Sequence, residues 1–162
     1  MPKIHLETII NIDNIDIVFN LIRSIDLHKI STKNSKEEAI AGKTSGLIAL
    51  NETVTWRAKH LGFTQELTSI ITDFKAPTFF ADEMVCGAFK SFRHEHYLEL
   101  KEGKVIVKDV FQYVSPFGFL GKLADFIFLK NYMKNFLVER NKVIKEYAES
   151  GKWKKVLKKE LL

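Results

Sequence analysis

The chain has 162 residues, of which 46% are hydrophobic and 28% are charged, so it is long enough to fold as one globular domain without covalent staples. Its single cysteine, Cys86, excludes an internal disulfide, and the amino terminus lacks the charged-then-apolar order of a signal peptide. No apolar run approaches the roughly 20 residues that a membrane span needs. We therefore expect a cytoplasmic protein.

The net charge of +5 is concentrated at the carboxyl end of the chain. Residues 152–162 contain five lysines and one glutamate, which gives +4, so residues 1–151 carry only +1. A nucleic-acid-binding domain normally presents a basic face on its folded body. The charge pattern therefore argues against a nucleic-acid partner. It favours a nearly neutral domain over residues 1–150, followed by a basic amphipathic tail over residues 151–162.

The first 50 residues predict a strand, two short helices, a loop and a further strand. Asp13 and Asn14 offer a helix N-cap, and apolar residues recur at helical spacing after them. This order of elements excludes a parallel Rossmann-type sheet. The predicted ranges are 3–11 for the strand, 15–23 and 24–30 for the helices, 31–45 for the polar link and loop, and 47–50 for the short strand.

Residues 52–114 alternate between apolar and polar side chains in long strands separated by turn residues. Val54, Trp56 and Ala58 share one side of their strand, for example, and Thr55 and Arg57 share the other. Long antiparallel strands twist and coil, which makes a sheet concave. The predicted strands are 52–60, 64–74, 78–85, 89–100 and 105–114, with turns at Leu61-Gly62, Lys75-Ala76-Pro77, Gly87 and Glu102-Gly103.

The longest helical pattern runs from Phe117 to Glu149, after the helix breaker Ser115-Pro116. Its early and late apolar residues face nearly opposite directions at about 100° per residue, so one straight helix cannot bury both sets. We expect a kink or break near residues 128–131. The long helix follows the strands in the sequence and fits the concave face of the sheet. The sequence therefore predicts an α+β fold.

This order of elements resembles the helix-grip fold of the START and birch-pollen-allergen (SRPBCC) superfamily. Two segments resemble its polyketide cyclase/dehydrase-like ligand-binding branch, and the resemblance spans residues 3–149. The resemblance implies a curved antiparallel sheet of about six or seven strands around a long carboxy-terminal helix, with two short helices after the first strand. It also implies a cavity for a lipid, sterol, quinone or polyketide between sheet and helix. The segments are Phe80-x-Asp82-Glu83-Met84-Val85-x-Gly87-Ala88-Phe89 with Phe92-x-His94-x-His96, and Asp109-x-Phe111-x-Tyr113-x-x-Pro116-Phe117-Gly118-x-Leu120-Gly121.

Alternation along the later strands directs a group of polar side chains toward the predicted concave face. If Phe92 faces inward, so do His94 and His96, and Asp109 follows Phe111 in the same way. Imidazoles and a carboxylate in an apolar concave wall are typical of a ligand site. Asp82 and Glu83 are neighbours on one strand and point to opposite faces, so only one of them can enter the predicted cavity. The predicted ligand-binding residues are Trp56, His60, Glu83, Phe92, His94, His96, Asp109, Phe111, Tyr113, Phe128 and Tyr132.

Three interpretations of these polar residues stay open. Two histidines at i and i+2 also occur where buried polar atoms simply satisfy one another. His94 or His96, oriented by Asp109, would suffice for the acid–base chemistry of a cyclase or dehydratase, so these three are candidate catalytic residues. The same histidines with His60 or Asp109 offer metal-ligand types, but no second metal motif accompanies them. We expect no metal and no cofactor.

The basic tail carries Trp153, Val156 and Leu157 at helical spacing. Such a segment either makes weak contact with an anionic membrane surface or packs on its own domain. The function predicted for the whole chain is binding or carriage of a small hydrophobic molecule, of lipid, quinone or polyketide type, between sheet and helix. The alternative is a cyclase or dehydratase that uses the cavity histidines and Asp109.

Overall fold

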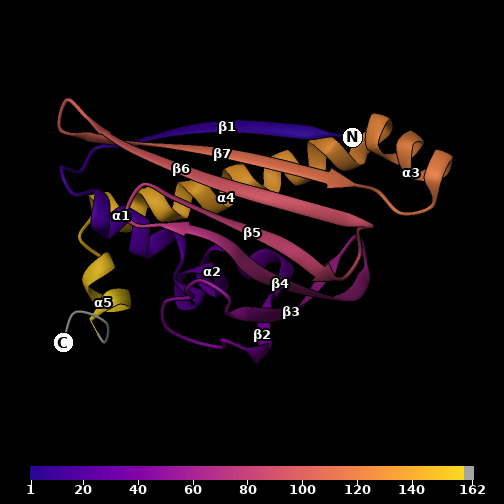
Figure 1. Ribbon diagram of the computed structural model, residues 1–162, viewed down its shortest axis with the longest axis horizontal. Helices are drawn as coiled ribbons and strands as arrows, with labels where there is room; N and C mark the ends of the chain where they lie inside the picture. Colours follow the sequence, from indigo (N-terminus) through magenta and orange to yellow (C-terminus); the bar gives the residue numbers. More distant parts are fainter. Residues whose placement is uncertain (159–162) are drawn as a thin grey trace.

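The computed structural model describes residues 1–158, apart from the side chain of Lys122. Seven strands form one antiparallel sheet in the order β1-β7-β6-β5-β4-β3-β2 (Figure 1). Two register shifts between β4 and β5 help this long sheet to curve. The strands are β1 (Lys3–Ile10), β2 (Glu38–Gly42), β3 (Thr53–His60), β4 (Phe63–Lys75), β5 (Phe79–Cys86), β6 (Ser91–Lys101) and β7 (Lys104–Val114).

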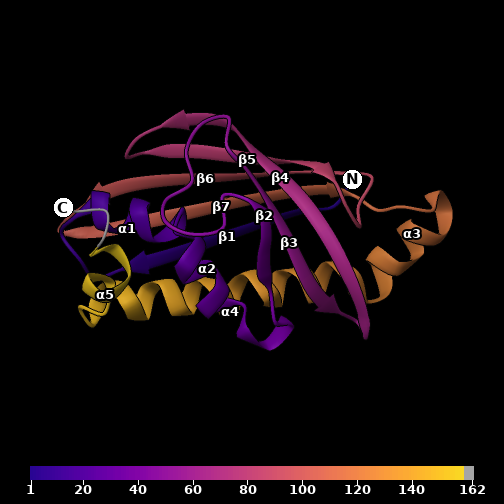
Figure 2. The same cartoon turned by 90° about the horizontal axis from the view of Figure 1, so that it is seen from below.

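The long helix α4 runs lengthwise along one side of the sheet, with α1 and α2 on that same side (Figure 2). The short helix α3 extends past one end of the sheet, and α5 lies at the opposite end (Figure 1). This arrangement confirms the predicted α+β fold, a curved sheet around a long carboxy-terminal helix with two short helices after the first strand. The helices are α1 (Ile15–Ile22), α2 (Ile25–Ser31), η1 (Lys33–Ser35), α3 (Gly118–Ala124), η2 (Asp125–Leu129), α4 (Lys130–Glu149) and α5 (Trp153–Leu157).

Side-chain caps fix the start of both short helices. The Asn14 side chain accepts a hydrogen bond from the Ile17 N–H at 3.1 Å, and the Ser24 hydroxyl accepts one from the Leu27 N–H at 3.2 Å. Each bond satisfies one of the amide groups that the first turn of a helix leaves without a partner. The caps let the chain turn sharply between α1 and α2, so that both helices bury their apolar residues in the core.

The irregularity expected in the long helix is the π-helical segment η2 at Asp125–Leu129. It separates two helices with opposite surroundings, because α4 buries Leu137, Ile144 and Ala148, whereas α3 exposes most of its apolar residues. A π-helical turn adds a residue to the helical repeat and so rotates the faces of the next helix relative to those of the preceding one. One helix therefore does not have to bury both apolar sets, because the earlier set stays exposed.

The structure differs from the sequence prediction between residues 36 and 50. Strand β2 lies within the segment predicted as a loop, because its backbone pairs with the edge of β3. The strand predicted at 47–50 does not form. Leu47 makes one isolated bridge to Ser24, and Arg23 donates a hydrogen bond to the Ile48 carbonyl at 3.1 Å. Contacts with the start of α2 therefore override the local strand propensity.

The hydrophobic core along the concave face of the sheet has two parts. Its larger part joins α1, α2 and α4 to the inward residues of the central strands, and a smaller cluster surrounds Phe111 and Tyr113 on β7. Among the residues that the structure describes, no helix has the length and apolar content needed to cross a membrane.

Candidate functional site

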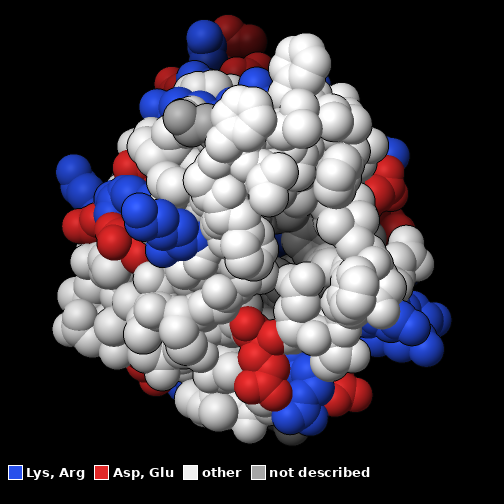
Figure 3. Space-filling view, turned by 90° about the vertical axis from the view of Figure 1, so that its right-hand side faces the viewer, with Lys and Arg blue, Asp and Glu red and all other residues white. Residues whose placement is uncertain are grey.

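A cavity of about 380 Å³ lies between the concave face of the sheet and α4. Phe92 and Phe111 contribute to its wall from the sheet, and Met133, Phe136 and Leu137 contribute from α4. The end-on view in Figure 3 shows a hollow at the centre of one end of the molecule, with charged side chains mostly toward the margins. The volume lies within the range of about 300–1,000 Å³ that is common for small-molecule sites.

Most of the residues predicted from the sequence line this cavity, but three do not. Asp109 lies directly behind two of the lining histidines, and Tyr113 is fully buried next to Phe89 and Phe111. Glu83 lies on the other face of the sheet, where it forms an ion pair with Arg93. The predicted residues that do line the cavity are Trp56, His60, Phe92, His94, His96, Phe111, Phe128 and Tyr132.

The inward carboxylate on β5 is Asp82 and not Glu83. Side chains alternate along a strand, and the buried Phe80 sets the inward parity that Asp82 shares. Glu83 takes the opposite parity, which also brings it within 3.3 Å of the Thr72 hydroxyl on β4. The spacing from Phe80 was therefore the signal in the sequence that distinguishes these two acids.

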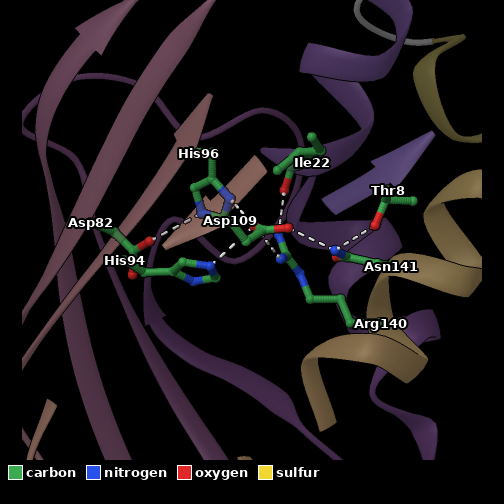
Figure 4. A network of polar contacts seen from close by, with 8 residues as sticks. All are labelled: Thr8, Ile22, Asp82, His94, His96, Asp109, Arg140 and Asn141. Carbon is green, nitrogen blue, oxygen red and sulfur yellow. Dashed lines mark hydrogen bonds and ion pairs between the residues drawn. The ribbon is translucent and has the colours of Figure 1, made fainter. Parts of the chain in front are cut away.

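Asp109 on β7 is the centre of a buried polar network at the inner wall of the cavity (Figure 4). Its Oδ1 accepts hydrogen bonds from His96 Nδ1 at 2.7 Å and from His94 Nε2 at 3.1 Å. Its Oδ2 accepts one from Asn141 Nδ2 at 2.6 Å, and Arg140 Nη1 lies 3.8 Å from Oδ1. We call this network the Asp109 cluster; its members are Asp82, His94, His96, Asp109, Arg140 and Asn141.

Hydrogen-bond chemistry fixes the tautomers of both histidines. A carboxylate only accepts hydrogen bonds, so the His94 Nε2 and His96 Nδ1 atoms that face Asp109 must carry hydrogens. The other nitrogen of His96 lies 3.5 Å from Asp82. The remaining nitrogen of a neutral His94, Nδ1, is then an acceptor on a side chain that lines the cavity.

Burial and charge set opposite protonation states for the two histidines. Burial, together with the charge of His96, lowers the pKa of His94 to about 4, although Asp109 opposes this shift. Burial also lowers the pKa of His96, but hydrogen bonds to Asp109 and Asp82 outweigh burial and raise that pKa above its usual range. Burial raises the pKa of Asp109, yet bonds from His94 and His96 hold it well below the usual range. Burial therefore favours the neutral form of His94, whereas the two carboxylates favour the protonated form of His96.

Arg140 brings an incompletely satisfied cation to the same wall. Its Nη2 donates a long hydrogen bond of 3.4 Å to the Ile22 carbonyl on α1. Its Nη1 has no hydrogen-bond partner among the described residues, although the residue is only 5% exposed. A buried donor without an acceptor costs roughly 1–3 kcal/mol, and more when it is charged. Arg140 also lines the cavity, although the Nη1 atom itself is buried beside Asp109.

Asp82, His94 and His96 are the described residues that could hold a metal ion, with one ligand atom from each lying within 4.8 Å of the others. Ligands about 2.1 Å from a tetrahedral zinc lie about 3.4 Å apart, and His96 Nε2 lies 3.5 Å from Asp82. A metal would have to displace the proton that Asp109 and Asp82 favour on His96. The hydrogen bonds of His96 therefore favour a proton over a cation, and the expected absence of a metal stays a prediction.

A second polar cluster lies where the edge of the sheet meets α4. Glu37, between η1 and β2, lies 2.6 Å from His28 Nε2 and 3.3 Å from His60 Nε2. His60 Nδ1 is 2.8 Å from the Tyr132 hydroxyl on α4, and the His28 ring stacks on Trp56 at 4.2 Å. We call Glu37, His28, His60 and Tyr132 the Glu37 clasp, because they join α2, β3 and α4 along the cavity wall.

The histidines decide the charge state of the clasp. Burial raises the pKa of Glu37, but the charge of His28 and hydrogen bonds from His28 and His60 outweigh it and hold that pKa at about 2. Glu37 is therefore ionised at neutral pH, and it anchors the edge of the sheet through charge-assisted hydrogen bonds.

Sequence reasoning missed the residues that α4 and the segment after η1 bring to the cavity. Arg140 and Asn141 interrupt the apolar stripe of α4 between Leu137 and Ile144, and a polar interruption of this kind was a usable signal. Glu37 lies in a polar stretch without periodicity, so the sequence carried no comparable signal for it.

No protein-family model matches the chain, and no curated protein matches it. Solved structures match over nearly its whole length. TTHA0849 from Thermus thermophilus is 14% identical, with a TM-score of 0.75 over 93% of this chain and 99% of that one. Ara h 8.0201 is 14% identical, with a TM-score of 0.66 over 92% and 98% of the two chains. Major latex-like protein 151 from Panax ginseng is 15% identical, with a TM-score of 0.67 over 91% and 97%. The chain therefore has the helix-grip fold that birch-pollen-allergen-like proteins share.

Proposed function

We propose that the chain binds and carries a small, largely apolar molecule with one polar end, of lipid, quinone or polyketide type. The observation that carries the proposal is a mostly apolar cavity of about 380 Å³ with the Asp109 cluster at its inner wall. Phe92, Phe111 and Leu137 supply apolar surface for the body of the ligand. Burial of such surface contributes about 25 cal/mol per Å² to binding before the entropic costs of association are counted.

The polar end of the ligand is assigned to Arg140 and His94. Arg140 Nη1 needs an acceptor, and His94 Nδ1 offers a lone pair to a donor. A carboxylic acid or a hydroxyl group meets both needs, and a carbonyl group meets the first. A hydrogen bond to a charged group contributes roughly 1.5–3 kcal/mol, so this contact would favour ligands with an oxygen at one end.

Binding fits the cluster better than acid–base catalysis by a cyclase or dehydratase. General catalysts work best when their pKa lies near the working pH, and the pKa of His94 is about 4. His96 is held between Asp109 and Asp82, so both of its ring nitrogens already face carboxylates. The candidate catalytic residues His94, His96 and Asp109 are therefore assigned to recognition and positioning of the ligand.

The contact of residues 152–162 with a membrane surface stays a prediction. Trp153 and Val156 pack against the core, and Leu157 is 1% exposed, so the apolar residues of α5 are directed at the domain. Residues 159–162 lie outside the described part of the chain. The proposal of ligand carriage makes no use of this tail.

The test begins with native mass spectrometry of the protein purified from its own host, and we expect a bound apolar molecule. The delipidated protein is then titrated with fatty acids, quinones and polyketide-like compounds by displacement of a fluorescent apolar probe. Ala58→Phe adds bulk to a residue that lines the cavity, and Lys59→Phe adds the same ring to the exposed neighbour on β3. We expect at least a tenfold loss of affinity for the first variant and less than a twofold change for the second.

Equal affinities in these two variants would contradict the proposal. If Ala58→Phe fails to fold, Ala88→Trp at the mouth of the cavity replaces it. His94→Ala and His96→Ala separate carriage from catalysis, because a carrier keeps part of its affinity and leaves the ligand chemically unchanged. A new product from the wild type, lost in both variants, would assign the site to an enzyme.

A further inference from the structure

Apolar side chains crowd the surface at one end of the molecule. Phe117, Phe119 and Phe126 are 83%, 78% and 88% exposed, although aromatic residues are normally the first to be buried. Soluble monomers rarely expose apolar side chains in such density unless the patch binds something. We call residues 117–128 the mouth lobe; its exposed apolar side chains are Phe117, Phe119, Leu120, Leu123, Phe126, Ile127 and Phe128.

The mouth lobe is continuous with the entrance of the cavity. Phe117 and Phe128 are exposed and also line the cavity, so the exposed patch passes directly into the interior. Leu61, in the turn after β3, does the same from the other side, and Phe63 beside it is 72% exposed. Figure 3 looks at this end and shows mostly uncharged side chains around the hollow, with acidic side chains below it.

Specific contacts hold the lobe in this outward position. The Ser115 hydroxyl donates a hydrogen bond of 2.6 Å to Asp125 Oδ2, and both residues are buried. A Cβ atom on Gly121 would lie 2.0 Å from the Pro116 carbonyl oxygen, so only glycine permits α3 to pack against the preceding segment. The exposed aromatic side chains therefore belong to a surface that the fold builds.

Four lysines lie close to the lobe. Lys130 and Lys134 are exposed at the start of α4, and Lys59 and Lys90 are exposed on the segments next to the mouth. None of these four lysines forms an ion pair with a carboxylate in the described part of the chain. Asp125 is the one acid between residues 115 and 136, and it is buried. Aromatic rings flanked by lysines match an anionic lipid surface, where each cation contributes about 1 kcal/mol.

We propose that the mouth lobe docks the protein on an anionic lipid bilayer, with the entrance of the cavity facing the membrane. A second copy of the chain is a poorer partner, because two-fold pairing of the lobes would bring their lysines together. A docked entrance would let an apolar molecule pass between bilayer and cavity without crossing water. That consequence rests on the proposed function, whereas docking itself depends only on the lobe.

The test measures how the purified protein floats with vesicles of neutral phosphatidylcholine and with vesicles that also contain phosphatidylglycerol. We expect the wild type to bind the anionic vesicles at least tenfold more strongly than the neutral ones. Phe119→Asp with Phe126→Asp should lower vesicle binding at least tenfold, because both exposed rings would insert into the membrane interface. Neither residue lines the cavity, so the substitutions leave the cavity wall unchanged. Lys130→Glu with Lys134→Glu should abolish the preference for anionic vesicles.

The matched control is Ile9→Asp with Leu100→Asp, which places the same two charges on apolar residues that are 45% and 46% exposed, and Leu100 lies at the far end of β6 (Figure 1). We expect less than a twofold change in vesicle binding for this variant. The proposal would be overturned if the wild-type protein does not bind vesicles. It would also be overturned if the control variant and the lobe variant lose vesicle binding equally. A wild-type dimer that the lobe variant converts to a monomer would overturn it in favour of a second copy.

Binding of soluble probe in the absence of vesicles separates the two proposals. The lobe variant should keep its affinity for the probe within about twofold, since its changes lie outside the cavity wall. Vesicle binding without probe binding would contradict the carrier function and support docking. Probe binding without vesicle binding would contradict docking and support the carrier function.

Discussion

The Asp109 cluster and the Glu37 clasp use the same chemistry, a carboxylate between two histidines, in different surroundings. The Asp109 side chain is 1% exposed and its two histidines are 8% and 2% exposed, whereas the Glu37 side chain is 7% exposed and its two histidines are each 22% exposed. The buried cluster needs Arg140 and Asn141 in addition to the histidines, because water cannot satisfy the remaining charge. The comparison teaches that burial decides how many partners one carboxylate requires.

The two sites also differ in what they connect. The Asp109 cluster joins β7, β6 and α4 and contains a buried donor without a hydrogen-bond partner among the described residues. The clasp joins the edge of the sheet to α4 through Tyr132. We therefore expect the cluster to dominate stability and ligand recognition, and the clasp to make a smaller contribution that depends on pH.

The largest effect is expected for Asp109→Asn, which keeps the size of the side chain but removes its charge. Arg140 and His96 would lose their buried counter-ion, and breaking a buried ion pair typically costs about 3–5 kcal/mol. Urea denaturation at neutral pH should show a loss of this size in the free energy of unfolding. Glu83→Gln, on the outer face, is the control and should cost less than about 1 kcal/mol. Equal losses would mean that burial does not distinguish these carboxylates.

Glu37→Gln should have the next largest effect, a loss of about 2 kcal/mol in the free energy of unfolding. Each unit of pKa shift corresponds to about 1.4 kcal/mol, and the glutamine keeps part of the hydrogen bonding to the histidines. The pKa of Glu37 falls from 4.5 to about 2 on folding, so the unfolded chain takes up the proton first. The stabilisation is therefore present above pH 4.5 and is lost as the pH falls toward 2. Unfolding measured across that range should show a smaller acid loss in the variant than in the wild type. Parallel curves would exclude this role for Glu37.

Tyr132→Phe should have a smaller effect, because it removes one hydrogen bond and leaves the ring in place. The bond to His60 Nδ1 is 2.8 Å long, and a bond of this kind contributes about 1 kcal/mol. Thermal unfolding should show a correspondingly small fall in the melting temperature. Tyr147→Phe on the same helix is the control, since the Tyr147 hydroxyl forms no hydrogen bond with the residues that the structure describes. A loss of the same size in both would show that the clasp does not depend on this hydroxyl.

The smallest effect is expected for Arg93→Gln on the outer face of the sheet. Arg93 pairs with Asp73 at 2.7 Å, with Glu95 at 3.0 Å and with Glu83, so it has more acidic partners than Arg140. Exposed pairs are screened by water and salt, so the loss should stay below about 1 kcal/mol and shrink further at high salt. A loss that matches Asp109→Asn and resists salt would show that partner number matters more than burial.

Sequence patterns predicted the fold and the inward residues of the central strands, because a strand repeats every two residues. Once Phe92 and Phe111 were placed inward, His94, His96 and Asp109 followed by parity. The same rule applied from Phe80 would have selected Asp82. Parity could not tell that Asp109 lies behind the histidines and does not line the cavity, because that depends on the depth of each side chain in the assembled wall.

Partners on other elements could not be predicted in the same way. Asn141 reaches Asp109 across 32 positions, and the phase of α4 against the sheet decides this contact. Glu37 reaches His60 only because β2 joins the edge of β3, within a segment whose sequence predicted a loop. Local periodicity gives no information on how one element approaches another.

The sequence by itself determined the antiparallel sheet, the long helix with its interruption, and an apolar concave face that carries histidines. These depend on local repeats of two and 3.6 residues, which the chain shows without any tertiary contact. Only the tertiary structure decided that Arg140 meets the cavity, that Glu37 clasps the edge of the sheet, and that the apolar residues of α3 face outward. Each of these depends on where separate elements come to rest against one another, and that is settled by packing over the whole core.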